Sequence, residues 1–339
     1  MTLVSIITPS FNQASFLEQT IRSVLLQEDV EIEYCVVDGA STDGSVEIIQ
    51  RYAAENTASE PQRLSWWVSE PDRGQAEAIN KGFKRARGDI IAWLNSDDLY
   101  MPGAVQKAIS TLQADPSLGL VYGDAITIDE AGRPLNRLSF GDWNLHDLLA
   151  FRIICQPAVF LRRSILEQAG YLDLSYHYML DHQLWIRMAR LAPIRHLPQI
   201  LAAARQHAGA KNVKQAVGFS QETQRCLEWF QTQPDLAILL AKEKRRILGG
   251  AYRLEARYYL DGGELRAALS NYAKSLWYSP GYALKHWHRI AYALLCTIGL
   301  KKLADHILLP ASAQCKHLTI PSELKDYHGW PGLNLEGVI

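Results

Sequence analysis

The sequence predicts an α/β fold over residues 1–210, with a mostly parallel sheet flanked by helices, and an all-α extension over residues 211–339. Short apolar runs alternate with helix-like stretches in the first half, which is the pattern of a parallel sheet. Polar residues follow the carboxyl ends of these runs. From Gln215 onward the apolar residues recur with a helical period almost throughout. We therefore expect two domains, 1–210 and 211–339, that meet near Lys211.

The elements can be predicted in order from these runs. The first four strands are expected at residues 3–8, 32–37, 64–68 and 90–94, separated by helices at 14–27, 44–56 and 75–87. Three further strand-like runs at 120–128, 156–161 and 195–204 flank helical stretches at 164–169 and 182–191. Residues 242–279 hold two helical patterns broken at Asp261-Gly262-Gly263. Ala268, Tyr272 and Pro280 have the spacing of a tetratricopeptide-type hairpin, a spacing that an ordinary helical hairpin also produces.

Composition excludes several classes of protein. The 339 residues are 48% hydrophobic and 21% charged, which is typical of a chain that buries a core and excludes a disordered chain. Five widely spaced cysteines without a C-x-x-C pair argue against a disulfide scaffold or a thiolate zinc site, and favour a reducing compartment. The first residues lack the basic region of a signal peptide, and no apolar run reaches the roughly 18 residues of a membrane helix. We therefore expect a soluble, cytoplasmic protein.

The net charge of −1 is the sum of an acidic first half and a basic second half of the chain. Residues 1–210 hold 18 Lys+Arg against 25 Asp+Glu, whereas residues 211–339 hold 17 against 11, so the two halves carry −7 and +6. The acidic half excludes nucleic-acid binding there, and it requires a metal ion if it binds a phosphorylated substrate. In the basic half, lysines and arginines bracket the apolar stretch 290–300 among several aromatic residues. This pattern predicts a peripheral contact with the inner face of a membrane, with a small helical core as the alternative.

Four segments carry motifs of one enzyme family. They are Ser5-Ile-Ile-Thr-Pro-Ser-Phe-Asn12, Val36-Val-Asp-Gly-Ala-Ser-Thr-Asp-Gly-Ser45, Asn95-Ser-Asp-Asp98 and Met179-Leu-Asp-His-Gln-Leu-Trp-Ile-Arg187. In this order and spacing, residues 3–207 resemble the family 2 glycosyltransferases, inverting enzymes of the GT-A fold. The resemblance implies that a sugar is transferred from a nucleotide-diphosphate donor to a hydroxyl acceptor. UDP is the nucleotide that this family uses most often.

The resemblance also implies a set of donor-binding residues. The nucleotide sugar is expected to contact Thr8, Pro9, Phe11, Asn12, Asp38, Arg73, Asn80, Lys81, Asn95 and Ser96. Asp38 ends an apolar strand, where a carboxylate needs a partner, and it is expected to hydrogen-bond the base. Many relatives carry an Arg before the helical Asn, where this chain has Ile79, so Arg73 or Lys81 would supply that charge. An ordinary strand–helix turn and an amphipathic surface helix are the structural alternatives.

Adjacent acids predict a metal site. Asp97 and Asp98 follow a fully apolar strand, and a divalent cation with oxygen ligands relieves the repulsion between them. The resemblance implies Mn²⁺ or Mg²⁺, with Asp97 as the main ligand, Asp98 as the second, and His207 as a ligand found in some relatives. Relatives usually have Asp at the position of Asn95, so this amide would contact ribose or complete the metal shell. A helix N-cap is the alternative for the two acids, and a surface loop for His207.

Asp181 is the expected general base. The resemblance implies that it takes the proton of the acceptor hydroxyl, which an inverting displacement requires of one carboxylate. An N-cap is again the alternative. We expect structural roles for His182 and for Asp43, which reads as a helix N-cap.

Two other functions remain open on the sequence. A sugar nucleotidyltransferase also uses paired carboxylates with a metal. Enzymes that resemble sugar-nucleotide pyrophosphorylases, however, begin with a Gly-rich loop, and the corresponding turn here, Thr8 to Asn12, contains no glycine. A helical-repeat adaptor with an idle catalytic domain would have no reason to keep both Asp97-Asp98 and Asp181. We expect a role in polysaccharide or glycolipid assembly, with a saccharide or lipid-linked acceptor. The sequence names neither the sugar nor the linkage.

Overall fold

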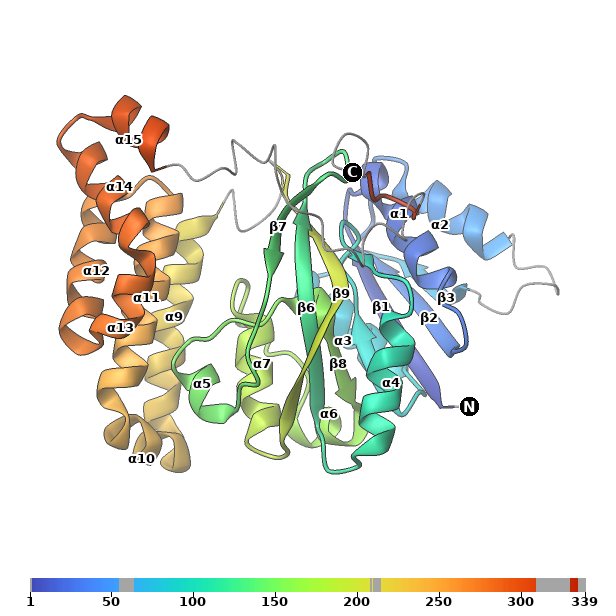
Figure 1. Cartoon of the computed structure of the whole chain (residues 1–339). Helices are drawn as coiled ribbons and strands as arrows, with labels where there is room; N and C mark the ends of the chain where they lie inside the picture. Colours follow the sequence, from blue (N-terminus) through green and yellow to red (C-terminus); the bar gives the residue numbers. More distant parts are fainter. Residues whose placement is uncertain (1, 55–63, 208, 210–214, 309–329, 335–339) are drawn as a thin grey trace. The chain divides into compact units, whose positions relative to one another are not determined.

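The computed structural model describes residues 2–54, 64–207, 209, 215–308 and 330–334, which form two compact units (Figure 1). The first unit contains the described residues of 1–144, 154–206 and 318–339. The second contains residues 145–153 and the described residues of 207–317. The division therefore differs from a single boundary near residue 210 by two segments, one inside the first half and one after the helices.

The first unit is built on a nine-stranded mixed sheet with the order β3-β2-β1-β4-β8-β6-β9-β5, in which β7 also pairs with β6. The strands are β1 (Leu3–Ser10), β2 (Glu31–Asp38), β3 (Leu64–Ser69), β4 (Ile90–Trp93), β5 (Leu99–Tyr100), β6 (Leu120–Ile128), β7 (Pro134–Leu138), β8 (Val159–Arg162) and β9 (Ile194–Arg205). Strands β3, β2, β1 and β4 are parallel to one another, and the short β8 joins β4 and β6 in antiparallel fashion. The N-terminal half of the sheet thus presents four carboxyl ends along one edge.

Helices cover both faces of this sheet because its strands are apolar on both sides. The helices and the 3-10 turn of the unit are α1 (Ala14–Leu25), α2 (Ser45–Ala54), α3 (Gln75–Arg85), α4 (Ala104–Ala114), η1 (Gln156–Ala158), α6 (Arg163–Ala169) and α7 (Leu180–Ala189). Ile6 of β1 joins a buried cluster with Leu17 of α1 and Val105 of α4. Its neighbour Ile7 points to the other face and lies against Gly82 of α3, where a Cβ would clash with it.

A segment late in the chain completes the first unit. Leu333 joins a buried cluster with Ile128 and Ile200, and Trp330 packs against the same cluster. The indole Nε1 of Trp330 donates a hydrogen bond of 2.9 Å to the carbonyl oxygen of Tyr100 in β5. Residues 330–334 are therefore part of the sheet unit, although a long helical region precedes them.

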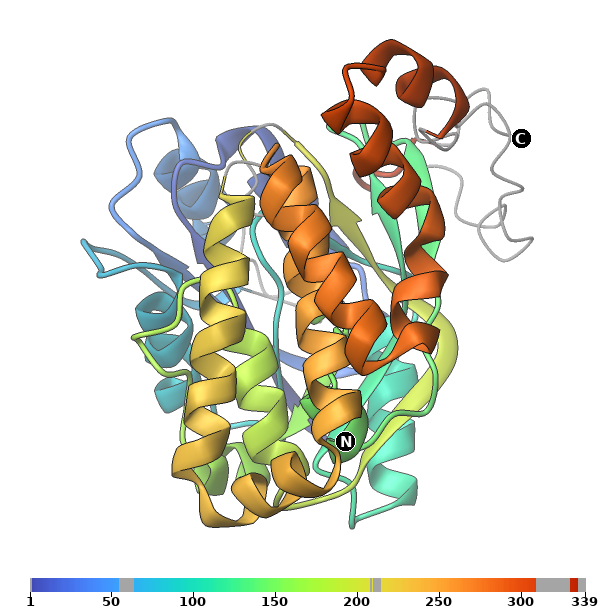
Figure 2. The same ribbon diagram turned by 90° about the vertical axis from the view of Figure 1, so that its left-hand side faces the viewer.

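The second unit is helical (Figure 2). Its elements are α5 (Leu145–Leu149), α9 (Ala216–Thr232), α10 (Pro234–Lys242), α11 (Lys244–Asp261), α12 (Leu265–Tyr278), α13 (Pro280–Ala283), η2 (Leu284–His286), α14 (Trp287–Thr297) and α15 (Lys301–Ile307). Helix α11 lies at its centre, against α9 and α12. The α5 segment belongs here because Asp147 pairs with Arg246 at 2.6 Å and the Ala150 carbonyl lies directly against Gly250, leaving no room for a Cβ.

The predicted fold class is confirmed: a mixed α/β sheet with flanking helices precedes a helical C-terminal region. Each predicted strand is present within a few residues of its expected bounds, and the predicted break at 261–263 separates α11 from α12. Strands β5 and β7 were not predicted, because β5 has only two residues and β7 lies mostly outside the core. Within the described parts of the chain, every helix is too short or too polar to cross a membrane.

Candidate active site

The parallel strands bring the predicted site residues to one edge of the sheet. Ser10 at the end of β1 pairs with Asp38 at the end of β2, and Ile7 of β1 pairs with Trp93 of β4. The turn after β1, the end of β2 and the segment after β4 are therefore neighbours. Open α/β sheets bind ligands at this edge, which makes it the candidate active site.

Asp38 is completely buried, and its carboxylate accepts three hydrogen bonds. Its Oδ2 accepts from the Ser41 backbone N–H at 2.9 Å and from Ser69 Oγ at 2.7 Å. Its Oδ1 accepts from Ser41 Oγ at 2.6 Å. These donors fix the carboxylate at the strand end, and its oxygens retain lone pairs for a further donor.

Phe11 and Asn12 form a turn that is tied to the loop after β2. Asn12 has a φ of 52°, a left-handed conformation that Asn tolerates. Its N–H donates to Ser41 Oγ at 2.8 Å, and its Oδ1 accepts from the Thr42 N–H at 2.9 Å. The Phe11 side chain is 61% exposed, and a Cβ on Gly39 would lie only 3.3 Å from its ring. An exposed aromatic ring beside a glycine offers a flat apolar surface to a planar ligand.

Thr8 and Pro9 lie within β1 and are buried, so they belong to the core rather than to the turn. The hydroxyl of Tyr34 donates to Thr8 Oγ1 at 3.0 Å. The Thr8 side chain thus has a partner inside the fold, and its expected contact with the donor remains a prediction. At the end of the same strand, Ser10 has a buried Oγ with no hydrogen-bond partner among the described residues.

The two expected cations of the α3 region are both paired with carboxylates. Arg73 forms an ion pair of 3.0 Å with Glu77, and its side chain is strongly exposed. Lys81 forms an ion pair of 2.9 Å with Glu70. A donor phosphate would therefore have to replace one of these carboxylates at either cation.

Asn80 holds the chain before α7. Its Nδ2 donates to the Leu172 carbonyl at 2.8 Å, and its Oδ1 accepts from the Leu172 N–H at 2.9 Å. Both ends of the buried amide are occupied by one backbone unit. Asn80 thus connects α3 to the segment before α7, and its expected contact with the nucleotide sugar remains a prediction.

Asn95 lies at the centre of an amide network. Its Oδ1 accepts from Gln75 Nε2 at 2.7 Å, and its Nδ2 donates to Asp98 Oδ2 at 3.1 Å and to Gln156 Oε1 at 3.0 Å. Gln156 Nε2 in turn donates to the Trp93 carbonyl at 2.8 Å. The expected contact of Asn95 with ribose or metal remains a prediction. Sequence reasoning missed Gln75 and Gln156, because neutral amides outside the four motifs give no charge signal.

Asp98 is buried, at 6% exposure, and it is hydrogen-bonded to the backbone of Arg205. Its Oδ1 accepts from the Arg205 backbone N–H at 3.0 Å, while its Oδ2 accepts from Asn95. Burial, and then the charge of Asp97, raise the pKa of Asp98 well above its usual value. Each oxygen accepts one hydrogen bond from the protein, and the expected role of Asp98 as the second metal ligand remains a prediction. Ser96 beside it is also buried.

Arg205 also fixes the position of Asp97. Its Nε donates to the Asp97 carbonyl at 2.9 Å, and its guanidinium lies 4.8 Å from the centre of the Phe16 ring. Asp97 itself is partly exposed. A small divalent cation is commonly held by one or two carboxylates together with substrate phosphates, so one accessible carboxylate beside a diphosphate fits such an ion. In the described residues, no three His, Cys, Asp or Glu side chains gather into a metal site.

His207 follows β9 and is partly buried, and it belongs to the second unit. Its expected role as a metal ligand remains a prediction.

Asp181 lies in the first turn of α7 and is partly exposed. The helix is anchored by Trp185, whose ring stacks on that of Trp93 with centroids 5.1 Å apart. Burial, and then the charges of Asp98 and Asp181, raise the pKa of the Cys155 thiol. Cys155 therefore lies within electrostatic range of both carboxylates, which brings α7 and the segment after β4 to the same edge of the sheet.

Asp43 caps two helices, in agreement with its expected structural role. Its Oδ2 accepts from the Ala14 N–H at 2.9 Å, and its Oδ1 accepts from Ser45 Oγ at 2.6 Å. Burial opposes ionisation, but the hydrogen bonds from Ser45 and Ala14 outweigh it and lower the pKa of Asp43. His182 is buried within α7.

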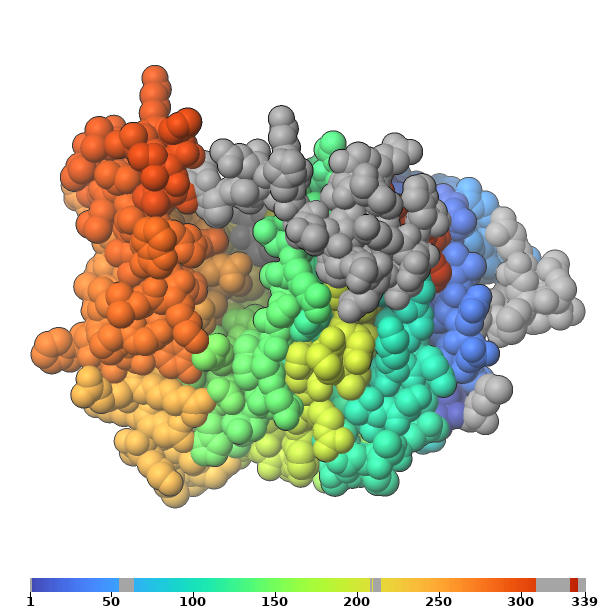
Figure 3. All heavy atoms as spheres, in the orientation of Figure 1, coloured from blue at the N-terminus to red at the C-terminus, as the bar shows by residue number. Residues whose placement is uncertain are grey.

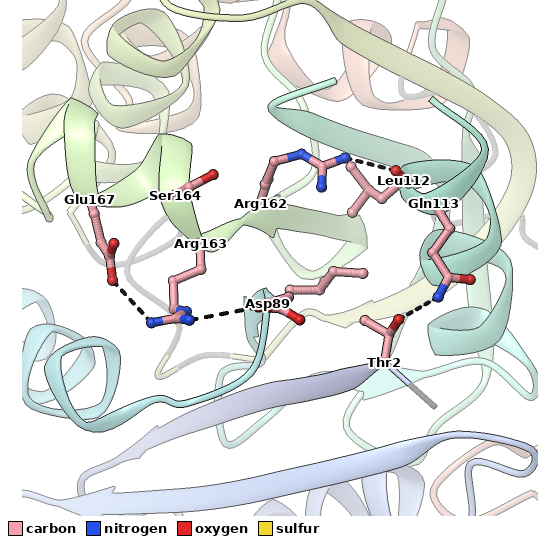
Figure 4. Close-up of a pocket in the computed structure, with 9 residues that line it drawn as sticks. Thr2, Asp89, Leu112, Gln113, Arg162, Arg163, Ser164 and Glu167 are labelled. Carbon is pink, nitrogen blue, oxygen red and sulfur yellow. Dashed lines mark hydrogen bonds and ion pairs between the residues drawn. The ribbon is translucent and has the colours of Figure 1, made fainter. Parts of the chain in front are cut away.

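A cavity of about 270 Å³ lies at the other edge of the sheet, near the amino ends of β1 and β4 (Figure 4). Arg163 in its wall pairs with Asp89 and Glu167, and Arg162 donates to carbonyl oxygens at the end of α4. The charged side chains Arg163, Asp89 and Glu167 in the cavity wall thus form ion pairs with one another. The cavity is remote from the strand ends that carry Asp38 and Asp97, so we do not assign the active site to it.

The fold and the carboxylates at the strand ends define a glycosyltransferase of the GT-A type. The model of the family described as glycosyl transferase family 2 matches residues 5–170. Residues 5–170, just under half of the chain, thus match this family of transferases. This outcome confirms the resemblance noted in the four motifs and leaves no support for a nucleotidyltransferase.

Known proteins agree with this assignment. Chondroitin synthase of Escherichia coli is 28% identical over 202 residues, which cover 58% of this chain and 28% of that protein. The chain thus spans about a third of the length of the first curated relatives that it matches.

Two solved structures share the fold. Residues 1–349 of TarS from S. aureus, in complex with UDP-GlcNAc, match with a TM-score of 0.57 at 14% identity, covering 94% of this chain and 93% of that one. The mannosyltransferase PcManGT from Pyrobaculum calidifontis, in complex with GDP-Man and Mn²⁺, matches with a TM-score of 0.52 at 20% identity, covering 88% and 86%.

Proposed function

We propose that this glycosyltransferase transfers a sugar, with inversion at the anomeric carbon, from a UDP-sugar to a hydroxyl group of a growing polysaccharide or glycolipid. The proposal is supported by the positions of Asp38 at the end of β2, of Asp97 after β4, and of Asp181 in the first turn of α7, whose Trp185 stacks on Trp93 at the end of β4. Three carboxylates with different surroundings can serve three different tasks in one site.

The donor would lie along the ends of β1, β2 and β4. Asp38 is fully fixed by Ser41 and Ser69, so it can accept a hydrogen bond from a base N–H without reorganising. The exposed ring of Phe11 beside Gly39 offers a stacking surface to the same base. UDP is favoured by its frequency in the family and by the UDP-GlcNAc held by TarS.

Asp97 would hold Mn²⁺ or Mg²⁺ together with the donor diphosphate. PcManGT is an example of a protein with this fold that contains Mn²⁺. A bound divalent ion would neutralise charge that develops on the departing nucleotide. Arg205 and Asn95 keep the surrounding segment in place, because Arg205 holds the Asp97 carbonyl and both residues hold Asp98.

Asp181 would act as the general base. In an inverting displacement the acceptor hydroxyl attacks the anomeric carbon on the face opposite the nucleotide, and a carboxylate on that face takes its proton. Asp181 is partly exposed, on an element different from those that hold Asp38 and Asp97. The stacked pair Trp93–Trp185 would keep the distance between the two sides of the site constant.

The acceptor is proposed to be a saccharide or a lipid-linked saccharide. The relative named chondroitin synthase supports polysaccharide assembly as the process. We place the reaction in the cytoplasm, at the inner face of a membrane, where lipid-linked acceptors would be available. The four cysteines in the described residues are not joined in disulfides, which fits a reducing compartment.

The proposal is tested by a thermal-shift screen of UDP- and GDP-sugars, each with and without Mn²⁺. A donor at 100 times its dissociation constant should stabilise the fold by about 2.7 kcal/mol. Asp38→Asn should reduce this stabilisation for the correct donor. Asp89→Asn, at the opposite sheet edge, is the matched control and should leave it unchanged. Failure of every nucleotide sugar to stabilise the protein would contradict the proposed donor class.

A further inference from the structure

The second unit exposes an apolar surface on α12, η2, α14 and α15. We call it the apolar face. It consists of Trp277, Leu284, Trp287, Leu294, Ile298, Leu300, Leu303 and Ile307, each at least 44% exposed. Trp277 and Trp287 are 80% and 62% exposed, although large aromatic side chains are normally enclosed. Helix α14 contacts both α12 and α15, and large apolar side chains exposed on neighbouring helices are typical of an interaction site.

The helical spacing shows that this exposure is systematic. Trp287, Leu294 and Ile298 occupy positions i, i+7 and i+11, which share one side of α14, while Ala293 on another side is buried. In the next helix, Leu303 and Ile307 are exposed four residues apart, and Ala304 between them is buried. Both helices therefore pack into the unit through small residues and turn their large apolar residues outward.

Basic residues predominate in the helices that carry this face, although Arg289 pairs with Asp261 at 2.7 Å. Residues 265–308 contain six Lys or Arg and a single acidic residue, Asp305, which gives this stretch a net charge of +5. Lys285, Lys301 and Lys302 are exposed within the same helices. Asp305 is already paired with Lys301 at 2.9 Å. The partner of the face must therefore be apolar at its centre and negatively charged at its edge.

We propose that the apolar face docks on the surface of an anionic lipid membrane. Tryptophan and aliphatic side chains enter the interfacial region of a bilayer, and each nearby Lys or Arg adds about 1 kcal/mol on anionic lipid. Helices of 11 and 7 residues are too short to span a bilayer, so the contact is peripheral. This inference deepens the proposed function, on which its biological purpose rests, because a membrane-bound chain stays near lipid-linked acceptors.

A second copy of the chain fits the face less well. In a two-fold dimer the same surface meets itself, so Lys285, Lys301 and Lys302 of both copies would approach one another. A positive surface disfavours its own approach, whereas an anionic bilayer attracts it.

The test is co-sedimentation of the full chain with vesicles of phosphatidylcholine alone or with 30% phosphatidylglycerol. We expect binding to the anionic vesicles only, weakened by 0.5 M salt because charge attraction is screened. Lys301→Gln combined with Lys302→Gln should weaken binding about tenfold or more. Brominated lipid chains should quench tryptophan fluorescence in the parent protein, and Trp287→Phe should remove much of that quenching.

Two isoleucines provide a matched comparison. Ile298 in the apolar face and Ile238 in α10 are both 68% exposed. Helix α10 lies at the other end of the second unit from α14 and α15 (Figure 3). Ile298→Ser should weaken vesicle binding several-fold, and Ile238→Ser should leave it unchanged. Equal thermal midpoints of the two variants would confirm that both fold.

Three outcomes would overturn the inference. They are equal binding to neutral and anionic vesicles, equal effects of Ile298→Ser and Ile238→Ser, and a dimer without lipid that Ile298→Ser dissociates. No binding to either vesicle would overturn it as well. Donor stabilisation in the thermal-shift screen is measured without lipid, so failure of membrane binding and failure of the proposed function are distinguished.

Discussion

The two units treat their aromatic residues in opposite ways. In the sheet unit Trp93 and Trp185 are fully buried and stacked on each other below the strand ends. In the helical unit Trp277 and Trp287 stand in solvent. The sheet unit uses its large side chains to make a rigid base for small polar loops, as binding a small donor requires. The helical unit leaves an extended apolar surface, which suits a much larger partner. Chemistry and attachment are thus expected to be separable by mutation.

The largest effect is expected from Asp181→Asn, which would separate chemistry from everything else. Loss of the proton acceptor should lower the transfer rate roughly 100-fold or more. Donor stabilisation in a thermal-shift assay and vesicle binding should both stay at parent values. The measurement is sugar transfer at saturating donor, with Asp89→Asn as the control. Near-normal turnover in the Asn variant would remove Asp181 from the mechanism.

Asp97→Ala and Asp98→Ala should fail in different ways. Asp97→Ala should weaken Mn²⁺-dependent donor binding, as should a chelator on the parent protein, with little change in stability. Asp98→Ala leaves the Arg205 N–H and an Asn95 N–H without acceptors, which should cost about 2–4 kcal/mol of unfolding free energy. Donor titration and urea unfolding of both variants separate these effects. Donor binding that survives chelation would show that the enzyme works without a metal.

A smaller, pH-dependent effect is expected in the helical unit from Glu255→Gln. Burial raises the pKa of Glu255 to about 7 from 4.5, although Gln224 donates a hydrogen bond to it. The folded state therefore holds the proton more tightly, so this stabilisation is complete below pH 4.5 and is lost as pH rises through 7. The difference corresponds to about 3 kcal/mol at most. Unfolding free energies at pH 5 and pH 8 should differ less in Glu255→Gln than in the parent protein.

Glu243→Gln is the control of opposite sign. Burial opposes ionisation of Glu243, but hydrogen bonds from Arg246 and His146 lower its pKa. Its contribution is present above its usual pKa and is lost as pH falls through the lowered value. If both variants change the pH dependence of the unfolding free energy in the same direction, burial does not raise the pKa of Glu255.

The backbone of the site was more predictable than the use of its side chains. Apolar runs that end in polar residues predicted the edge at which the parallel strands β1, β2 and β4 end. Periodicity and motif order are sufficient for that. They do not indicate which polar atoms form hydrogen bonds within the protein and which remain available to a ligand. Asn95 and Asp98 satisfy donors and acceptors from Gln75, Gln156 and Arg205, which lie up to 107 positions from their partners in the sequence.

The helical half shows the same limit. Its helices followed from the period, but amphipathic spacing alone cannot say which side of α14 is covered. On the sequence, the aromatic residues of this half could belong either to a helical core or to an exposed surface. Their burial in the structure differs from one residue to another. Tyr272 is buried, whereas Trp277 and Trp287 are not. The outcome depends on Ala293 and Ala304, small residues that permit close packing of the helices.

The hydrogen bond between Trp330 and Tyr100 has a consequence for biosynthesis. Its two partners are 230 residues apart, and Leu333 fills the same cluster as Ile128 and Ile200. During synthesis on the ribosome, this cluster cannot form completely until the whole helical region and then Trp330 and Leu333 have been made. Until then the outer surface of β5 and β6 stays uncovered, and contacts of such long sequence separation form slowly. A nascent chain would therefore be most prone to aggregation, and most dependent on chaperones, late in its synthesis.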